Sequence, residues 1–156
     1  MLLKAMELCD EGTEDWARCA SSAFQIVYDD DRDEVCKPEW WNDEELKALS
    51  ARVVAAEPHT WQTCYMRATV LCAFDLGPRI AAEIKQAATW FRRAVAFGAR
   101  CPDELEDYAS ELDQLADRNA AWELLAEEEK EKQQVANGKA SKTRQGNGKK
   151  SKKGRR

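Results

Sequence analysis

Apolar residues recur every three or four positions between widely spaced glycines and prolines, and this spacing restricts the chain to helices. Before residue 137 those punctuating residues are Gly12, Pro38, Pro58, Gly77, Pro78, Gly98 and Pro102. Between them the apolar positions follow the 3.6-residue period of a helix and not the two-residue period of a strand. The sequence therefore predicts an all-α fold of about six helices.

Capping residues predict where the first four helices begin. A short helix over residues 2–9 is expected to close near Gly12, and Thr13 is expected to cap a second one. Asn42 precedes an acidic first turn, so we expect it to cap a third helix. Pro58 suits the first turn of a fourth helix better than a helix interior.

Similar signals divide the second half of the chain. Leu76, Gly77 and Pro78 end the fourth helix, and a fifth is expected from Ile80 until Gly98, a natural residue to follow a C-cap. Pro102 opens the last helix. Seven of its residues, apolar except for Asn119, alternate in steps of three and four: Leu105, Tyr108, Leu112, Leu115, Asn119, Trp122 and Ala126. This heptad spacing predicts a seam within the molecule, with a coiled-coil dimer as the alternative.

Charge separates the chain into two parts. Residues 137–156 hold nine lysines and arginines, no acidic residue and no aromatic residue, whereas residues 1–136 hold 15 basic and 29 acidic residues. A segment without large apolar side chains cannot bury enough surface to offset the conformational entropy that it would lose on ordering. We therefore predict a helical domain over 1–136 and a disordered basic tail over 137–156.

The cysteines do not form a metal or disulfide signature. They lie at Cys9, Cys19, Cys36, Cys64, Cys72 and Cys101, with no CxxC pair. Zinc sites use closely spaced ligand pairs, and disulfide-dense chains are usually smaller and secreted. We expect reduced, buried thiols. The start of the chain carries charges at positions 4, 7, 10 and 11, which interrupt any signal peptide.

A short pattern recurs within the chain. Ala20, Phe24 and Val27 have the same spacing as Ala87, Phe91 and Ala94: a small residue, an aromatic four positions on, and an apolar residue three further on. This pattern resembles the second helix of a tetratricopeptide repeat, best over 58–98 and more weakly over 13–29. The resemblance implies antiparallel helical hairpins and a surface that binds peptides or proteins.

The sequence lacks the residue patterns of several kinds of catalytic and binding site. His59 is the one histidine, and neither a GxGxxG nor a P-loop motif occurs. The acidic run Asp29, Asp30, Asp31, Asp33 and Glu34 lacks the spacing of an EF-hand. No apolar run approaches the length of a membrane span. We expect a non-enzymatic protein without metal, cofactor or membrane contact.

Two features are candidates for binding. Adjacent Trp40 and Trp41 point in different directions, so one ring is expected to pack in the fold, and the pair could also anchor a protein partner. The tail residues Lys149, Lys150, Lys152, Lys153, Arg155 and Arg156 could bind RNA or DNA phosphates nonspecifically, target the chain to the nucleus, or only solubilise it.

These features give a function hypothesis. We expect an intracellular interaction module, cytoplasmic or nuclear, that binds another protein. The alternative is an accessory protein that binds nucleic acid or another polyanion through its tail. The sequence leaves open the oligomeric state and whether the chain is a piece of a longer repeat array.

Overall fold

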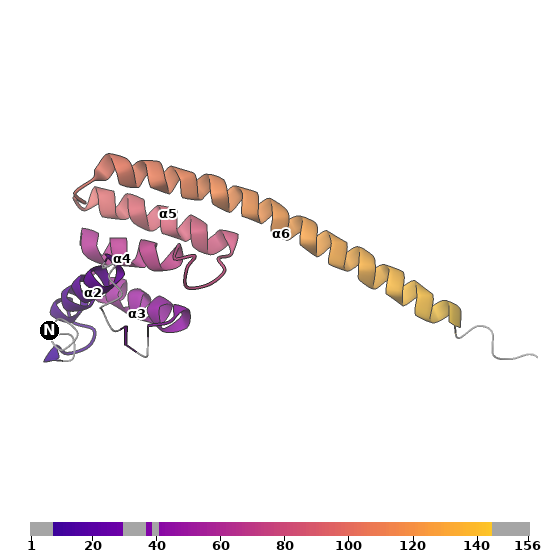
Figure 1. Ribbon diagram of the computed structural model, residues 1–156, viewed down its shortest axis with the longest axis horizontal. Coiled ribbons are helices and arrows are strands. Elements are labelled where there is room, and N and C mark those ends of the chain that lie inside the picture. The colour runs from indigo at the N-terminus through magenta and orange to yellow at the C-terminus, as the bar shows by residue number, and fades with distance from the viewer. Residues whose placement is uncertain (1–7, 30–36, 39–40, 145–156) are drawn as a thin grey trace, which may run out of the picture. The chain divides into compact units, whose positions relative to one another are not determined.

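The described part of the chain is helical. The structure is a computed structural model that describes residues 8–29, 37–38 and 41–144. It contains α2 (Glu14–Asp29), α3 (Asp43–Ala56), α4 (Trp61–Leu71), α5 (Ala81–Ala96) and α6 (Pro102–Arg144), and these described residues form no strand (Figure 1). The all-α prediction is confirmed. The helix predicted over residues 2–9 lies largely outside the described residues.

The chain divides into two compact units, residues 1–119 and residues 120–156. The first unit contains α2 to α5 and the beginning of α6, and α4, α5 and that beginning lie side by side (Figure 1). The second unit contains the rest of α6. The boundary therefore falls within a helix, whereas composition predicts a boundary at residue 136.

One part of the core in the first unit joins α4, α5 and the beginning of α6. Buried alanines on all three helices let their backbones approach closely, and larger side chains fill the space between them. The buried members are Ala68, Leu71, Cys72, Ile84, Ala87, Ala88, Phe91, Ala109, Leu112 and Ala116. Phe91 meets Tyr65 and Tyr108 edge to face, with ring centroids 5.7 and 5.3 Å away.

A second part of the core joins α2, α3 and α4. Its buried members are Trp16, Ala17, Ala20, Phe24, Leu46, Leu49, Val53, Met66 and Val70. Four of them lie on α2, and two of these, Ala20 and Phe24, belong to the recurring pattern found in the sequence. Met66 and Val70 lie on α4, as do Ala68 and Leu71 of the first cluster, so α4 is the element shared by both parts of the core.

The capping predictions hold at three helix ends. The Thr13 hydroxyl accepts the amide of Trp16 at 3.2 Å, and the Asn42 side chain accepts the amide of Glu45 at 3.0 Å. Gly98 follows α5 with φ +86°, a conformation that favours glycine. The boundary predicted at Pro58 is confirmed: α3 ends at Ala56 and α4 begins at Trp61, and the proline lies in the turn between them instead of in the first turn of α4.

Helix α6 departs from its predicted seam after Ala116. Ala109, Leu112 and Ala116 are buried, but Trp122 is 71% exposed. The packed face of the helix therefore ends before the point that the heptad spacing predicts. The helix runs to Arg144, which makes residues 137–144 helical although composition predicts disorder from 137. Residues 145–156 lie outside the described part.

Candidate functional site

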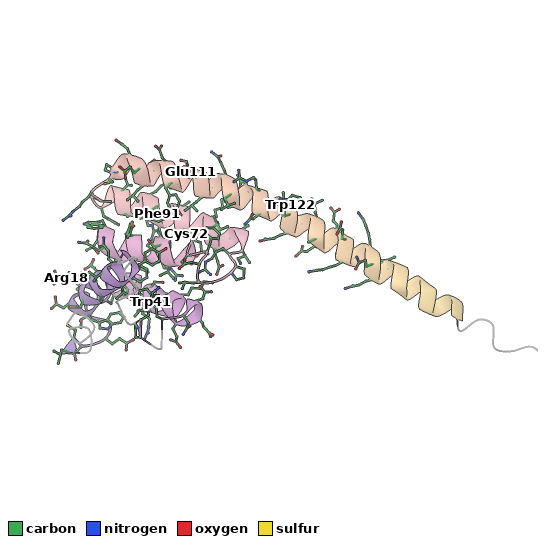
Figure 2. All side chains as sticks on the ribbon, in the orientation of Figure 1. Arg18, Trp41, Cys72, Phe91, Glu111 and Trp122 are labelled. Carbon is green, nitrogen blue, oxygen red and sulfur yellow. The ribbon has the colours of Figure 1, made fainter. Side chains whose placement is uncertain are left out.

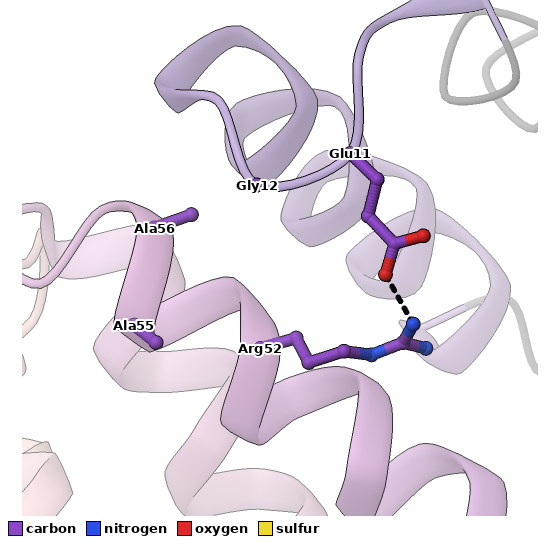
Figure 3. Close-up of a pocket in the computed structure, with 5 residues that line it drawn as sticks. All are labelled: Glu11, Gly12, Arg52, Ala55 and Ala56. Carbon is purple, nitrogen blue, oxygen red and sulfur yellow. Dashed lines mark hydrogen bonds and ion pairs between the residues drawn. The ribbon is translucent and has the colours of Figure 1, made fainter.

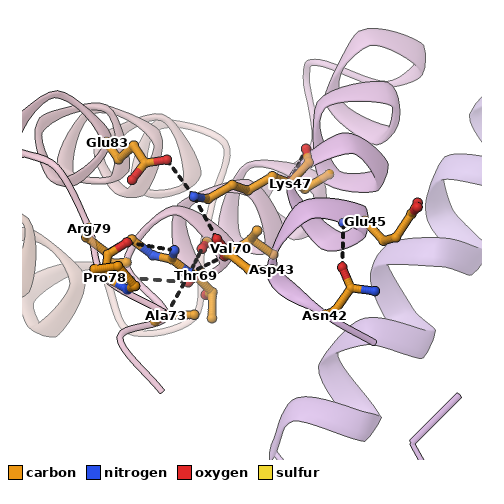
Figure 4. Close-up of polar contacts among 12 residues, drawn as sticks. Asn42, Asp43, Glu45, Lys47, Thr69, Val70, Ala73, Pro78, Arg79 and Glu83 are labelled. Carbon is orange, nitrogen blue, oxygen red and sulfur yellow. Dashed lines mark hydrogen bonds and ion pairs between the residues drawn. The ribbon is translucent and has the colours of Figure 1, made fainter. Parts of the chain in front are cut away.

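A buried arginine organises the junction between α3, α4 and α5. The Arg79 side chain follows the Gly77–Pro78 turn and is fully buried. Its Nη2 donates to the carbonyl oxygens of Ala73 at 2.7 Å and Val70 at 3.3 Å, and forms an ion pair with Asp43 Oδ1 at 2.6 Å (Figure 4). The Val70 carbonyl also accepts the amide of Ala73, and the Ala73 carbonyl accepts that of Leu76, so the guanidinium adds a further donor to each at the end of α4. Arg79 therefore attaches that end to the first turn of α3.

The ion pairs continue from α3 to α5 through Lys47. Its Nζ lies 2.9 Å from Asp43 Oδ2 and 2.6 Å from Glu83 Oε1. Burial alone would raise the pKa of Asp43, but Arg79 and Lys47 outweigh it and hold that pKa below its ordinary value. Burial would likewise lower the pKa of Lys47, and Glu83 and Asp43 reverse the direction.

The carboxylate of Asp43 makes stability depend on pH. Because its pKa is lowered in the folded state, its contribution is present above the ordinary value of 3.8 and is lost as pH falls through the folded value. We expect the difference in unfolding free energy between wild type and Asp43→Asn to be larger at pH 7 than in acid. Urea titrations at both pH values measure it. An equal difference at both would show that the charge of Asp43 contributes nothing.

Arg67 of α4 joins the polar cluster through hydrogen bonds to α3. Its Nη1 donates to the Lys47 carbonyl at 2.8 Å and to the Ser50 hydroxyl at 2.9 Å. Burial lowers the pKa of Arg67. The cluster contains cations, carboxylates, carbonyls and the Ser50 hydroxyl, and this arrangement suits attachment of the helices to one another.

The buried thiols are poorly suited to catalysis. Burial raises the pKa of both Cys64 and Cys72, which disfavours the reactive thiolate. The Tyr108 hydroxyl donates to Cys72 Sγ at 3.8 Å, and burial raises the pKa of Tyr108 as well. Cys101 is exposed, which corrects the prediction that the cysteines are buried. Cys36 lies outside the described residues.

A pocket of about 590 Å³ opens between the N-terminal turn and α3. It is lined by Glu11, Gly12, Arg52, Ala55 and Ala56 (Figure 3). Glu11 and Arg52 form an ion pair across it, and the Arg52 guanidinium lies 6.0 Å from the ring centroid of Trp16. Because its two charged groups neutralise each other, the pocket presents little to hold a charged ligand.

Of the two predicted tryptophan anchors, Trp41 lies within the described residues. Trp41 is half-buried and stacks on Phe24 of α2, with ring centroids 5.5 Å apart (Figure 2). Lys37 Nζ lies 5.8 Å from the same ring. Trp41 thus contributes to the packing of α2 against the segment before α3. Trp40 lies outside the described residues, as do Lys149, Lys150, Lys152, Lys153, Arg155 and Arg156.

Helix α6 carries the apolar surface that the sequence did not single out. Trp122, Leu124 and Leu125 are 71%, 63% and 54% exposed, and Figure 2 labels Trp122 on this helix. Trp122 and Leu125 are three residues apart and share one face of the helix with Ala121, whereas Leu124 points away from Trp122. The heptad extrapolation missed this surface because it assigned Trp122 to the internal seam.

The described residues show neither a metal-ligand cluster nor a membrane span. They hold no group of three metal-ligating side chains. His59 is exposed and meets Phe97 edge to face, 5.7 Å between centroids. No helix in this part of the chain is long and apolar enough to cross a membrane. Comparisons with protein-family models, curated proteins and solved structures give no match for the chain.

Proposed function

We propose that the chain is a non-enzymatic, intracellular interaction module with tetratricopeptide-like helical hairpins, which binds another protein. The observation that carries the proposal is the exposure of Trp122 and Leu125 on one face of α6. Large apolar side chains gathered on a surface are typical of interaction sites, and tryptophan is enriched among residues that dominate binding energy. The buried pattern of Ala87, Phe91 and Ala94 supports the hairpin interpretation.

The charges beside this face define the partner. Glu127, Glu128 and Glu129 follow Leu125 after one residue, Ala126, and Glu131 lies one turn beyond Glu127. A complementary surface has an apolar stripe flanked by lysine or arginine, since like charges opposite the glutamates would repel. The proposed partner is therefore a basic amphipathic helix of another protein.

Replacement of Trp122 and Leu125 by serine tests the proposal. A synthetic amphipathic helix of leucine and lysine is expected to bind the wild-type chain and to bind this double variant at least about tenfold more weakly. A leucine and glutamate peptide of equal length is expected not to bind. Fluorescence anisotropy of labelled peptides measures both, and circular dichroism checks that helix content is unchanged.

Two control variants separate this surface from other candidates. Phe74→Ser removes a half-exposed apolar side chain elsewhere, and Trp41→Ala removes the aromatic anchor predicted from the sequence. Binding lost equally in Phe74→Ser, or lost only in Trp41→Ala with its fold intact, contradicts the assignment to α6. Light scattering of the chain alone reports whether a second copy occupies the face.

A second candidate function rests on the basic residues after 136. Nine lysines and arginines without an acidic residue favour contact with the phosphates of RNA or DNA. Glutamine at Lys149, Lys150, Lys152, Lys153, Arg155 and Arg156 would then abolish salt-dependent binding of a single-stranded oligonucleotide. The Trp122 and Leu125 double variant would still bind it, so the two functions are distinguishable.

A further inference from the structure

Two thiols meet where the chain enters α2. The Sγ atoms of Cys9 and Cys19 lie 3.9 Å apart, and both side chains are half-buried. Closure of a disulfide requires these sulfurs to approach to a bond length of about 2.05 Å. We propose that this pair is a modification site: Cys9 and Cys19 close a reversible disulfide when the chain meets a hydroperoxide.

A tight turn holds the two thiols together. Gly12 has φ +87°, a conformation in which a side chain is strained, and this residue reverses the chain between Cys9 and α2. The turn is closed by the amide and the hydroxyl of Thr13, which donate to the carbonyl oxygen of Asp10 at 3.2 and 2.7 Å. The proximity of the sulfurs therefore follows from backbone geometry.

Side-chain contacts attach the same turn to the rest of the first unit. Cys9 packs against the core cluster shared by α2, α3 and α4. Glu11, in the turn, forms its ion pair with Arg52 of α3. Because both sides of the pair are anchored, the reaction of the two thiols is intramolecular, with the rate advantage of fixed proximity over reaction between chains.

The reaction balances with one peroxide. The thiolate of one cysteine attacks a peroxide oxygen, which breaks the O–O bond, forms a sulfenic acid and releases the other oxygen as water or alcohol. The second thiol then attacks the sulfenic sulfur, the S–S bond forms and water leaves. Two electrons pass from the sulfurs to the peroxide. A thiol reductant reverses the step by thiol–disulfide exchange.

The surroundings of Cys9 make the rate of closure depend on pH. Burial raises the pKa of Cys9, and so do Cys19, Asp15 and Asp10. The thiolate is the attacking species, so the rate of closure is expected to increase with pH through the neutral and mildly alkaline range. No basic side chain that would favour the thiolate is among the described groups that shift this pKa.

The cleavage sites of trypsin make the product easy to detect. Cys9 falls in the peptide 5–18 and Cys19 in the peptide 19–32, so the two peptides remain joined only by the disulfide. The full chain is treated with hydrogen peroxide, its remaining thiols are alkylated, and the digest is analysed by mass spectrometry. The expected result is the joined pair, at a rate that does not change on dilution and with separation by dithiothreitol.

Matched variants distinguish oxidation of a thiol pair that the fold holds together from general thiol oxidation. Cys101→Ser removes an exposed thiol and is expected to leave closure unchanged. Gly12→Ala strains the turn and is expected to slow closure severalfold. Oxidation of the wild type is expected to raise the midpoint of thermal unfolding, and Cys19→Ser is expected to abolish that shift.

Three outcomes would overturn the proposal. The peptides could emerge separately, each with a sulfinic acid or with the alkyl label. Cys9 or Cys19 could be joined to Cys36 or to a second chain. Closure in Gly12→Ala could match the wild type, which would show that the turn does not set the geometry.

Discussion

Arg79→Met is expected to lower the free energy of unfolding by about 3 kcal/mol, because it removes two buried hydrogen bonds and deprives Asp43 of its buried cation. The Arg79 side chain is fully buried, and its Nη2 bonds the carbonyls of Val70 and Ala73 and pairs with Asp43. Methionine fills a similar volume but donates nothing. Urea denaturation followed by circular dichroism measures the change.

Two further arginine variants define what this loss means. Arg79→Lys keeps the charge but not the planar fork, so it is expected to recover only part of the stability. Arg18→Met removes a cation whose pair with Asp15 is exposed, and the unfolding midpoint is expected to stay unchanged. Equal effects of Arg79→Met and Arg18→Met would show that the buried guanidinium does not attach α4 to α3.

Phe91→Ala is expected to cost about 3–5 kcal/mol of unfolding free energy, since it opens a cavity where three helices meet. Phe91 is buried between Tyr65 of α4 and Tyr108 of α6 and makes edge-to-face contacts with both rings. Truncation removes both aromatic contacts and the apolar area that fills the space. Urea and thermal denaturation, monitored by circular dichroism, measure the change.

Because a loss of this size approaches the whole stability of a small domain, a milder variant is needed. Phe91→Leu keeps most of the volume and is expected to fold with a smaller loss. Phe74→Ala, at a half-exposed phenylalanine, is the matched control and is expected to have little effect. If Phe91→Leu and Phe74→Ala cost the same, Phe91 does not fill the space between α4, α5 and α6.

Local signals predicted the helices well because their causes lie within a few residues. Thr13 and Asn42 cap helices where they were expected, and Gly98 ends α5. Each depends on a bond or a backbone angle that involves its immediate neighbours. Pro58 marks the boundary between α3 and α4 as expected, but it lies in the turn before α4, because a proline suits both that turn and the first turn of a helix.

The candidate sites were harder to predict, because exposure depends on which elements pack together. Trp41 and Trp122 are both tryptophans near apolar residues in sequence, yet Trp41 stacks on Phe24 while Trp122 is exposed. The heptad spacing of α6 continues through Trp122, but the neighbouring core reaches only Ala116. Periodicity indicates which residues share a face, not how far a partner helix extends.

The sequence by itself determined the helices, the alanine and phenylalanine positions that let them pack, and the separation of acidic and basic charge. These properties follow from the spacing and chemistry of nearby residues. Only the tertiary structure decided that Arg79 is buried against Asp43, that Cys9 meets Cys19, and that Trp122 is exposed. Such facts depend on contacts between separate helices or across a turn, and no periodicity in the chain encodes them.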